Sequence, residues 1–130
     1  MRGDGPEIMI YGIGIDIVKI KRMRDAVERW GERFLRRIFT EHEIAYCYEK
    51  KEPYPSLAVR FAAKEAIIKA LNSDVFIPLT DIEIINDKNG QPFVRANGRF
   101  KDILQRRSIS RCFISLSHES EFGIALAVME

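Results

Sequence analysis

The sequence predicts one α+β domain, in which a small, mainly antiparallel sheet packs against one long central helix. Apolar residues alternate near both ends of the chain, in residues 9–18 and 122–129, as is typical of strands. Between them, residues 60–71 favour a helix and are apolar in nearly every direction, so this helix is expected to be buried. A chain of 130 residues is long enough for one core but not for two.

Composition narrows the class of protein. The chain is 46% hydrophobic and 31% charged, with a net charge of +2 that is too small for a general polyanion binder. No apolar run approaches the roughly 20 residues that span a bilayer, and the N-terminus lacks a signal-peptide pattern. We therefore expect a cytoplasmic protein with no membrane contact. Residues 1–8 read as a disordered lead-in or a non-native remnant, and the domain is expected over residues 9–130. Cys47 and Cys112 lack metal-ligand spacing, which favours reduced thiols.

The first predicted strand, residues 9–18, has two different faces. One face carries Ile13, Ile15 and Ile17. The other carries Gly12, Gly14 and Asp16. Two glycines inside a strand often mark the close approach of a ligand or of another backbone. Asp16 follows these glycines and is a candidate site residue, although Asp is also a preferred cap for the helix that follows.

A basic amphipathic helix is predicted from Lys19 to about Trp30, with Ile20, Met23, Val27 and Trp30 on its apolar side. Its outer side is rich in arginine, either as a solvated face or as a docking surface for an acidic protein or nucleic acid. Gly31 is expected to end the helix, residues 34–39 to form a short apolar turn, and a capping box at residues 40–43 to open a helix through Tyr48.

The central helix is expected to open at Ser56 or Leu57, after a proline-containing loop, and to end before residues 72–74. It carries Arg60, Lys64, Glu65 and Lys69, charges that enter an interior only when paired, metal-bound or facing a ligand. Glu65 and Lys69 share one helical face. They are either an ordinary solvated pair or part of a site for a metal-bound phosphate.

The last third of the chain alternates short elements: strands at 80–85 and 93–95, a basic helix at 99–107, and a hairpin of residues 112–116 and 122–129. His118 stands at the predicted hairpin turn. A histidine there is either a structural hydrogen-bond partner or, beside a phosphate, a donor or proton shuttle.

Three motifs in this order resemble the holo-acyl-carrier-protein synthase family, the short phosphopantetheinyl transferases. They are Ile-Tyr-Gly-Ile-Gly-Ile-Asp-Ile (residues 10–17), Arg-Phe-Ala-Ala-Lys-Glu-Ala (60–66) followed by Lys69, and Ser-Leu-Ser-His (115–118). The resemblance implies transfer of the 4′-phosphopantetheine arm from coenzyme A to a serine of an acyl carrier protein, in support of fatty acid synthesis. The second product of this transfer would be adenosine 3′,5′-bisphosphate.

The resemblance also implies roles for single residues. Asp16 and Glu65 would hold Mg²⁺, which prefers one or two carboxylates with phosphate oxygens and water. Lys69 would contact the coenzyme A diphosphate. The other expected nucleotide contacts are Arg60, Lys64, Ser117 and His118, although Arg60 and Lys64 are alternatively partners of a neighbouring subunit. Glu65, directly or through a water, is the first choice of general base, and His118 is the second.

Partners follow from the same resemblance. Acyl carrier proteins are acidic around their modified serine, so Arg22 and Arg29 would dock that partner in a salt-sensitive contact. Short members of the family assemble as homotrimers with active sites at the subunit interfaces. The alternative is a non-catalytic basic module that binds nucleic acid or an acidic protein. We favour it less and expect no nucleic-acid binding, because no aromatic stacking platform accompanies the arginines.

The chain departs from the family pattern at three places. Residues 72–74 replace a glycine-rich turn, Gln91 replaces a common lysine, and Glu119 follows His118 where a small hydroxyl residue is common. The first two changes put contacts with coenzyme A in doubt. We expect Glu119 either to weaken phosphate affinity or to orient the imidazole.

Overall fold

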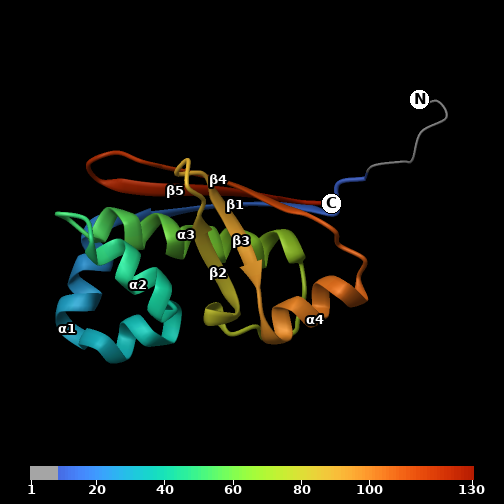
Figure 1. Ribbon diagram of the computed structural model, residues 1–130, viewed down its shortest axis with the longest axis horizontal. Coiled ribbons are helices and arrows are strands. Elements are labelled where there is room, and N and C mark those ends of the chain that lie inside the picture. Colours follow the sequence, from blue (N-terminus) through green and yellow to red (C-terminus); the bar gives the residue numbers. More distant parts are fainter. Residues whose placement is uncertain (1–8) are drawn as a thin grey trace.

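The computed structural model describes residues 9–130, so the expected lead-in, residues 1–8, lies outside the described residues. The α+β fold is confirmed (Figure 1). In chain order the elements are β1 (Gly12–Lys19), α1 (Ile20–Ile38), α2 (Glu41–Tyr48), α3 (Tyr54–Leu71), the 3₁₀ turn η1 (Leu79–Asp81), β2 (Ile82–Asn86), β3 (Pro92–Ala96), α4 (Gly98–Arg106), β4 (Cys112–His118) and β5 (Phe122–Met129).

Two antiparallel sheets frame the central helix α3. One sheet has the strand order β1-β5-β4, and the other is the hairpin of β2 and β3. In Figure 1, α3 runs along the underside of the three-stranded sheet, with α1 and α2 at one end and α4 at the other. The two chain ends of the fold thus pair as neighbouring strands, β1 and β5, over the middle of the sequence.

The glycines of β1 are there because α3 lies directly against this strand. A Cβ atom on Gly12 would fall 1.9 Å from the Ala70 carbonyl oxygen, and one on Gly14 would fall 1.9 Å from that of Ala66. The expected close approach to the glycine face is therefore confirmed, and what approaches is helix backbone. The two-residue period of a strand then points Asp16 toward α3 as well.

Helix α1 differs from its prediction. It does not end at Gly31 but continues to Ile38 across a kink, where Gly31 has φ 67° and ψ −149°. Glycine tolerates this backbone at no steric cost. The predicted apolar turn at residues 34–39 is largely helical, with Leu35 and Ile38 buried. The prediction that Trp30 lies on the buried side is wrong, because its side chain is 61% exposed beside the kink.

Two other boundaries shift, and a third is confirmed. The capping box of α2 is confirmed, since Thr40 and Glu43 exchange both hydrogen bonds. Helix α3 begins at Tyr54, earlier than expected, because Pro55 fits the first helical turn, where its missing N–H is not needed. Strand β4 extends through His118, so residues 117 and 118 belong to the strand and the hairpin turn follows them.

The core divides into two apolar clusters along α3. The corner cluster holds α1, α2 and the first turns of α3: Ile20, Met23, Val27, Leu35, Ile38, Phe39, Cys47, Leu57 and Ala58. The sheet cluster holds the rest of α3 with both sheets and α4. The chain itself covers most of α3 and buries most of its apolar residues, whereas Lys69 stays exposed.

Candidate active site

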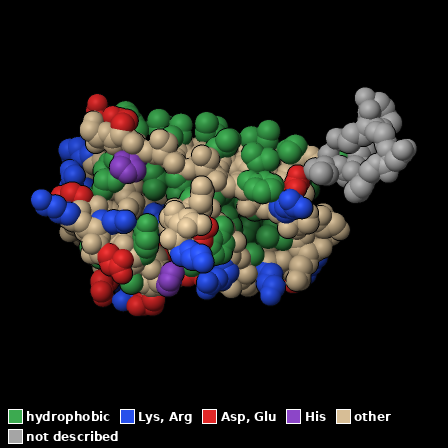
Figure 2. Space-filling model, turned by 45° about the horizontal axis from the view of Figure 1, so that its top comes forward, with side chains coloured by type: hydrophobic (Ala, Val, Ile, Leu, Met, Phe, Trp, Pro, Cys, Tyr) green, Lys and Arg blue, Asp and Glu red, His purple; other side chains and the backbone are tan. Residues whose placement is uncertain are grey.

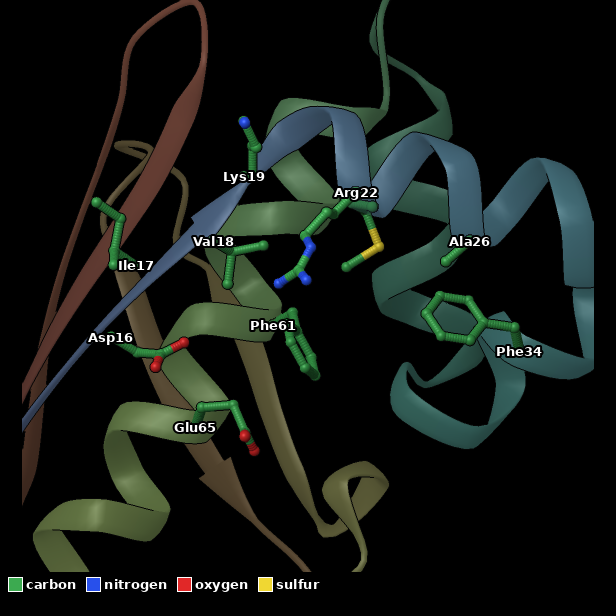
Figure 3. Close-up of a pocket in the computed structure, with 10 residues that line it drawn as sticks. Asp16, Ile17, Val18, Lys19, Arg22, Ala26, Phe34, Phe61 and Glu65 are labelled. Carbon is green, nitrogen blue, oxygen red and sulfur yellow. The ribbon is translucent and has the colours of Figure 1, made fainter.

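Two of the predicted site residues line one pocket of about 290 Å³. Asp16 comes from β1 and Glu65 from α3, and Figure 3 shows their side chains next to each other on the pocket wall. Arg22 of α1 reaches into the same pocket, and Phe34 and Phe61 supply apolar walls. The close packing of β1 on α3 is what brings the two carboxylates together.

Lys69 lies on the Asp16 side of this pocket. Its Nζ donates to Asp16 Oδ1 at 2.9 Å and to the Ile15 carbonyl oxygen at 2.9 Å. The Lys69 side chain is 56% exposed and that of Asp16 only 19% exposed, so the pair is open to ligands from one side. Glu65 and Lys69 are therefore not an isolated solvated pair, because Asp16 is the partner of Lys69.

The charge of Glu65 is costly in this place. Burial raises the pKa of the Glu65 carboxyl, and the neighbouring Asp16 carboxylate raises that pKa further, whereas the Lys69 ammonium lowers it. Two carboxylates whose negative charges repel each other are a suitable pair of ligands for a divalent cation.

The donor set fits Mg²⁺. Across residues 9–130, no three or more His, Cys, Asp and Glu side chains gather into a metal cluster. Magnesium does not need such a cluster, since it commonly binds one or two carboxylates and completes its shell with substrate phosphates and water. Asp16 and Glu65 are the residues that would hold it.

A second pocket, of about 570 Å³, contains Arg60 and His118. The Arg60 guanidinium stacks over Tyr46, donates to Asn86 and to the Ser56 carbonyl oxygen, and has its Nε without a partner. Lys50, Tyr46 and Asn86 line this pocket and were not predicted as site residues. No local motif marks them, because only the fold brings residues 46–50, 86 and 118 together.

Lys64 lies elsewhere. Its side chain is fully buried, and its three donors go to the Ile38 carbonyl at 2.6 Å, the Glu43 carboxylate at 2.7 Å and the Leu79 carbonyl at 3.0 Å. An ammonium has three donors, so Lys64 has none left for a phosphate. The structure gives Lys64 an internal role, and we leave it out of the coenzyme A site.

Two further predicted residues stand apart from both pockets. Ser117 is exposed on the outer face of the sheet, because neighbouring residues in a strand point to opposite faces and His118 faces inward. Arg29 lies on the outside of α1, with its guanidinium 5.0 Å from the centre of the Trp30 ring.

Two of the three departures from the family pattern have local explanations. Asn72 adopts the left-handed conformation (φ 50°) that ends α3, which Asn tolerates in place of Gly. Glu119 accepts from the backbone N–H groups of Glu121 and Phe122 and so closes the β4–β5 turn. These backbone hydrogen bonds lower the pKa of Glu119. Its hydrogen bonds are therefore to the turn.

Comparison with known proteins indicates the family of this chain. The family model of the 4′-phosphopantetheinyl transferase superfamily matches residues 12–127. A holo-[acyl-carrier-protein] synthase of Halothermothrix orenii is 45% identical over 123 residues, covering 94% of this chain and 98% of that protein. One of Thermodesulfovibrio yellowstonii is 42% identical, covering 93% and 99%.

Solved structures are similar over the same length. The crystal structure of holo-[acyl-carrier-protein] synthase from Neisseria meningitidis has a TM-score of 0.87 at 35% identity, covering 94% of this chain and 99% of that one. The Helicobacter pylori enzyme, in complex with coenzyme A, has a TM-score of 0.80 at 33% identity, covering 91% and 99%. The chain therefore belongs to the 4′-phosphopantetheinyl transferase superfamily, within its holo-[acyl-carrier-protein] synthase family of enzymes.

Proposed function

We propose that this enzyme transfers the 4′-phosphopantetheine group from coenzyme A to a serine of an apo acyl carrier protein, with Mg²⁺, in support of fatty acid synthesis. The observation that carries the proposal is the shared pocket of Asp16 and Glu65, with Lys69 paired to Asp16. The coenzyme A complex of the Helicobacter pylori relative supports coenzyme A as the donor.

The reaction moves one phosphoryl-linked group. The serine oxygen forms a bond to the β-phosphorus of coenzyme A, and the bond from that phosphorus to the bridging oxygen breaks. Adenosine 3′,5′-bisphosphate leaves with the electron pair, and the serine proton goes to a base. Mg²⁺, when bound at Asp16 and Glu65, supplies Lewis-acid stabilisation of the phosphate oxygens. Lys69 offers a compact positive charge for the same diphosphate.

Glu65 is our choice of general base. It lies in the same pocket as Asp16, where it would accept the serine proton directly or through a water. His118 is the second choice, and it lines the other pocket, away from Asp16 and Glu65. We assign His118 and Arg60 to the nucleotide portion of coenzyme A, because both line this other pocket.

The two separate pockets favour an assembly in which neighbouring subunits complete each site, as in the expected homotrimer. The outer face of the three-stranded sheet offers an interface for it: Ile13, Ile15, Ile17, Phe113, Ile124 and Leu126 are all substantially exposed there. In Figure 2, which turns the sheet forward, hydrophobic side chains lie along the upper part of the molecule. An apolar patch of this kind marks an interaction surface. Ser117, on the same face, would then meet a neighbouring subunit.

The acidic carrier would dock on α1. Arg22 lies within the pocket of Asp16 and Glu65, and Arg29 lies further along the exposed side of the same helix. Such a contact weakens with added salt.

A cytoplasmic location remains a prediction from the sequence. Among the described residues, no helix has the length and apolarity to cross a membrane.

The test is to incubate the protein with coenzyme A, Mg²⁺ and an apo acyl carrier protein and to measure the carrier mass. We expect the mass of the phosphopantetheine arm to be added, and we expect Asp16→Asn and Glu65→Gln to abolish the transfer while the fold is kept. No added mass on a carrier that another transferase modifies would overturn the proposal. Binding of nucleic acid with a steep salt slope and without Mg²⁺ would instead favour the basic binding module.

A further inference from the structure

A buried ionic network joins the two apolar clusters of the core. Its centre is Lys64 on α3 and Glu43 on α2, both fully buried, 2.7 Å apart. Lys64 also donates to the carbonyl oxygens of Ile38, the last residue of α1, and of Leu79 in η1. One side chain of α3 therefore holds the ends of three other elements.

Glu43 extends the network on its other side. Its Oε1 accepts from the Thr40 backbone N–H at 2.8 Å, and its Oε2 accepts from the Ile84 backbone N–H in β2 at 2.7 Å. The Thr40 hydroxyl donates to Glu83, which also pairs with Arg95. Every polar atom of the central pair has a protein partner, so the pair specifies one arrangement of these elements.

The contact at Ile38 matters because α1 is not continuous. The kink at Gly31 interrupts helical geometry, so the orientation of residues 32–38 depends on what they pack against. Leu35 and Ile38 pack in the corner cluster, and the Lys64 ammonium binds the carbonyl at the end of the helix. A cation at a helix C-terminus is favourable for the helix dipole as well.

The segment held in this way faces the proposed site. Phe34 lines the pocket of Asp16 and Glu65, and it also lines a neighbouring pocket of about 370 Å³ with Trp30, Arg33 and Arg37. These aromatic and basic side chains continue the surface on which the carrier is proposed to dock. Their position relative to Asp16 depends on the angle across Gly31.

We propose that Lys64 and Glu43 are positioning residues that set this angle, and so align the second half of α1 for the acyl carrier protein. The proposal rests on the proposed transferase function. It leaves metal binding to Asp16 and Glu65, because β1 packs on α3 through Gly12 and Gly14, independently of the network.

Trp30 provides a direct readout, since it is the single tryptophan of the chain and lies next to the kink. We would compare Lys64→Met and Glu43→Gln with the wild type by Trp30 emission, Mn²⁺ affinity and transfer kinetics. We expect a shifted emission maximum and a KM for the carrier raised about tenfold, since small misplacements of positioned groups carry large costs. Mn²⁺ affinity and kcat at saturating substrates should stay within about twofold of the wild type, because the hydrogen bonds of Lys64 and Glu43 do not include Asp16 or Glu65. Coenzyme A affinity is not the readout. Glu43 and Tyr46 are both on α2, and Tyr46 stacks on Arg60, so a change at Glu43 could also alter the proposed coenzyme A contact of Arg60.

Ile103→Val is the matched control. Ile103 is buried in the sheet cluster, so this change lowers stability without touching the network, and it should leave Trp30 emission and the carrier KM unchanged. If Lys64→Met does not fold, Glu43→Gln carries the test, because glutamine also serves in a capping box. An unchanged carrier KM and emission in a folded variant would overturn the positioning role, as would a loss of Mn²⁺ affinity in step with KM. Absence of transfer by the wild type would instead overturn the proposed function.

Discussion

Helix α3 carries two lysine–carboxylate pairs only five residues apart in sequence, and their surroundings differ completely. Lys64 and Glu43 are fully buried, whereas in the second pair Lys69 is 56% exposed and Asp16 is 19% exposed. Lys64 has all its donors paired with protein acceptors, whereas Lys69 is open to solvent on one side. A closed pair can only organise structure, and an open pair can exchange its partner for a ligand.

The difference follows from where each residue lies around α3. Lys64 faces the junction of α1, α2 and η1, where elements pack from several directions. Glu65 and Lys69 lie beside β1, where the glycines allow contact with helix backbone and leave Asp16 at the rim. Neighbouring residues of one motif thus form a buried structural pair in one case and, in the proposed function, part of the active site in the other.

The largest expected effect on stability comes from the closed pair. Lys64→Met leaves the Glu43 carboxylate buried without its counter-ion, and we expect a loss of about 3–5 kcal/mol in the free energy of unfolding. Denaturant titration measures this loss. The double variant with Glu43→Gln should lose less than the sum of the two single changes, because the two residues are coupled. Additive losses would argue against the pair as one unit.

The largest expected effect on activity comes from the open pair. Lys69→Met should lower kcat by about 10²–10³-fold, the range for removing one charge-stabilising donor. The free energy of unfolding should change by less than about 1 kcal/mol, as for other exposed pairs. Steady-state transfer assays and denaturant titration give the two values. A stability loss as large as that of Lys64→Met would remove the distinction between the pairs.

A substitution where β1 packs on α3 should lower both stability and metal affinity. Gly14→Ala forces β1 away from the Ala66 carbonyl, and we expect a cost of about 1–3 kcal/mol from overpacking. Because the same contact brings Asp16 to Glu65, metal affinity should fall too. Thermal unfolding and metal titration measure these effects. Gly90→Ala in the open β2–β3 turn, where a Cβ meets nothing within 4 Å but φ is +83°, is the control, since it should lower stability through backbone strain and leave metal affinity unchanged.

The smallest expected effect is a gain in stability, on replacing Glu65. The pKa of Glu65 is raised in the folded state, so any stability from its protonated form is present at low pH and is lost as pH rises through that pKa. Glu65→Gln should therefore be more stable than the wild type above this range, with the difference vanishing below the unfolded-state pKa. Unfolding temperatures measured against pH test this sign. A difference independent of pH would mean that Glu65 is not strained by burial and by Asp16.

Much of this arrangement could be predicted from local sequence. The glycine face of β1, the capping box at Thr40 and the hairpin of β4 and β5 follow from patterns within a few residues. Asp16 and Glu65 were expected together through family resemblance, and the structure places them in one pocket.

Other features depend on contacts distant in sequence. Nothing near Lys64 distinguishes it from Lys69, because its acceptors lie at residues 38, 43 and 79. The helical period of residues 20–30 predicted Trp30 on the buried side of α1. The side chain lies next to the kink at Gly31 and is exposed. Phe61 could have been found, since it lies one helical turn before Glu65 and lines the same pocket.

The most direct test of the two roles is Mn²⁺ binding measured by electron paramagnetic resonance, in the presence of coenzyme A, on three variants. The account predicts that Asp16→Asn and Glu65→Gln lose the bound Mn²⁺ signal, whereas Glu43→Gln, in the closed pair, keeps wild-type affinity. Wild-type affinity in Asp16→Asn, or a loss in folded Glu43→Gln as large as that in Glu65→Gln, would contradict it.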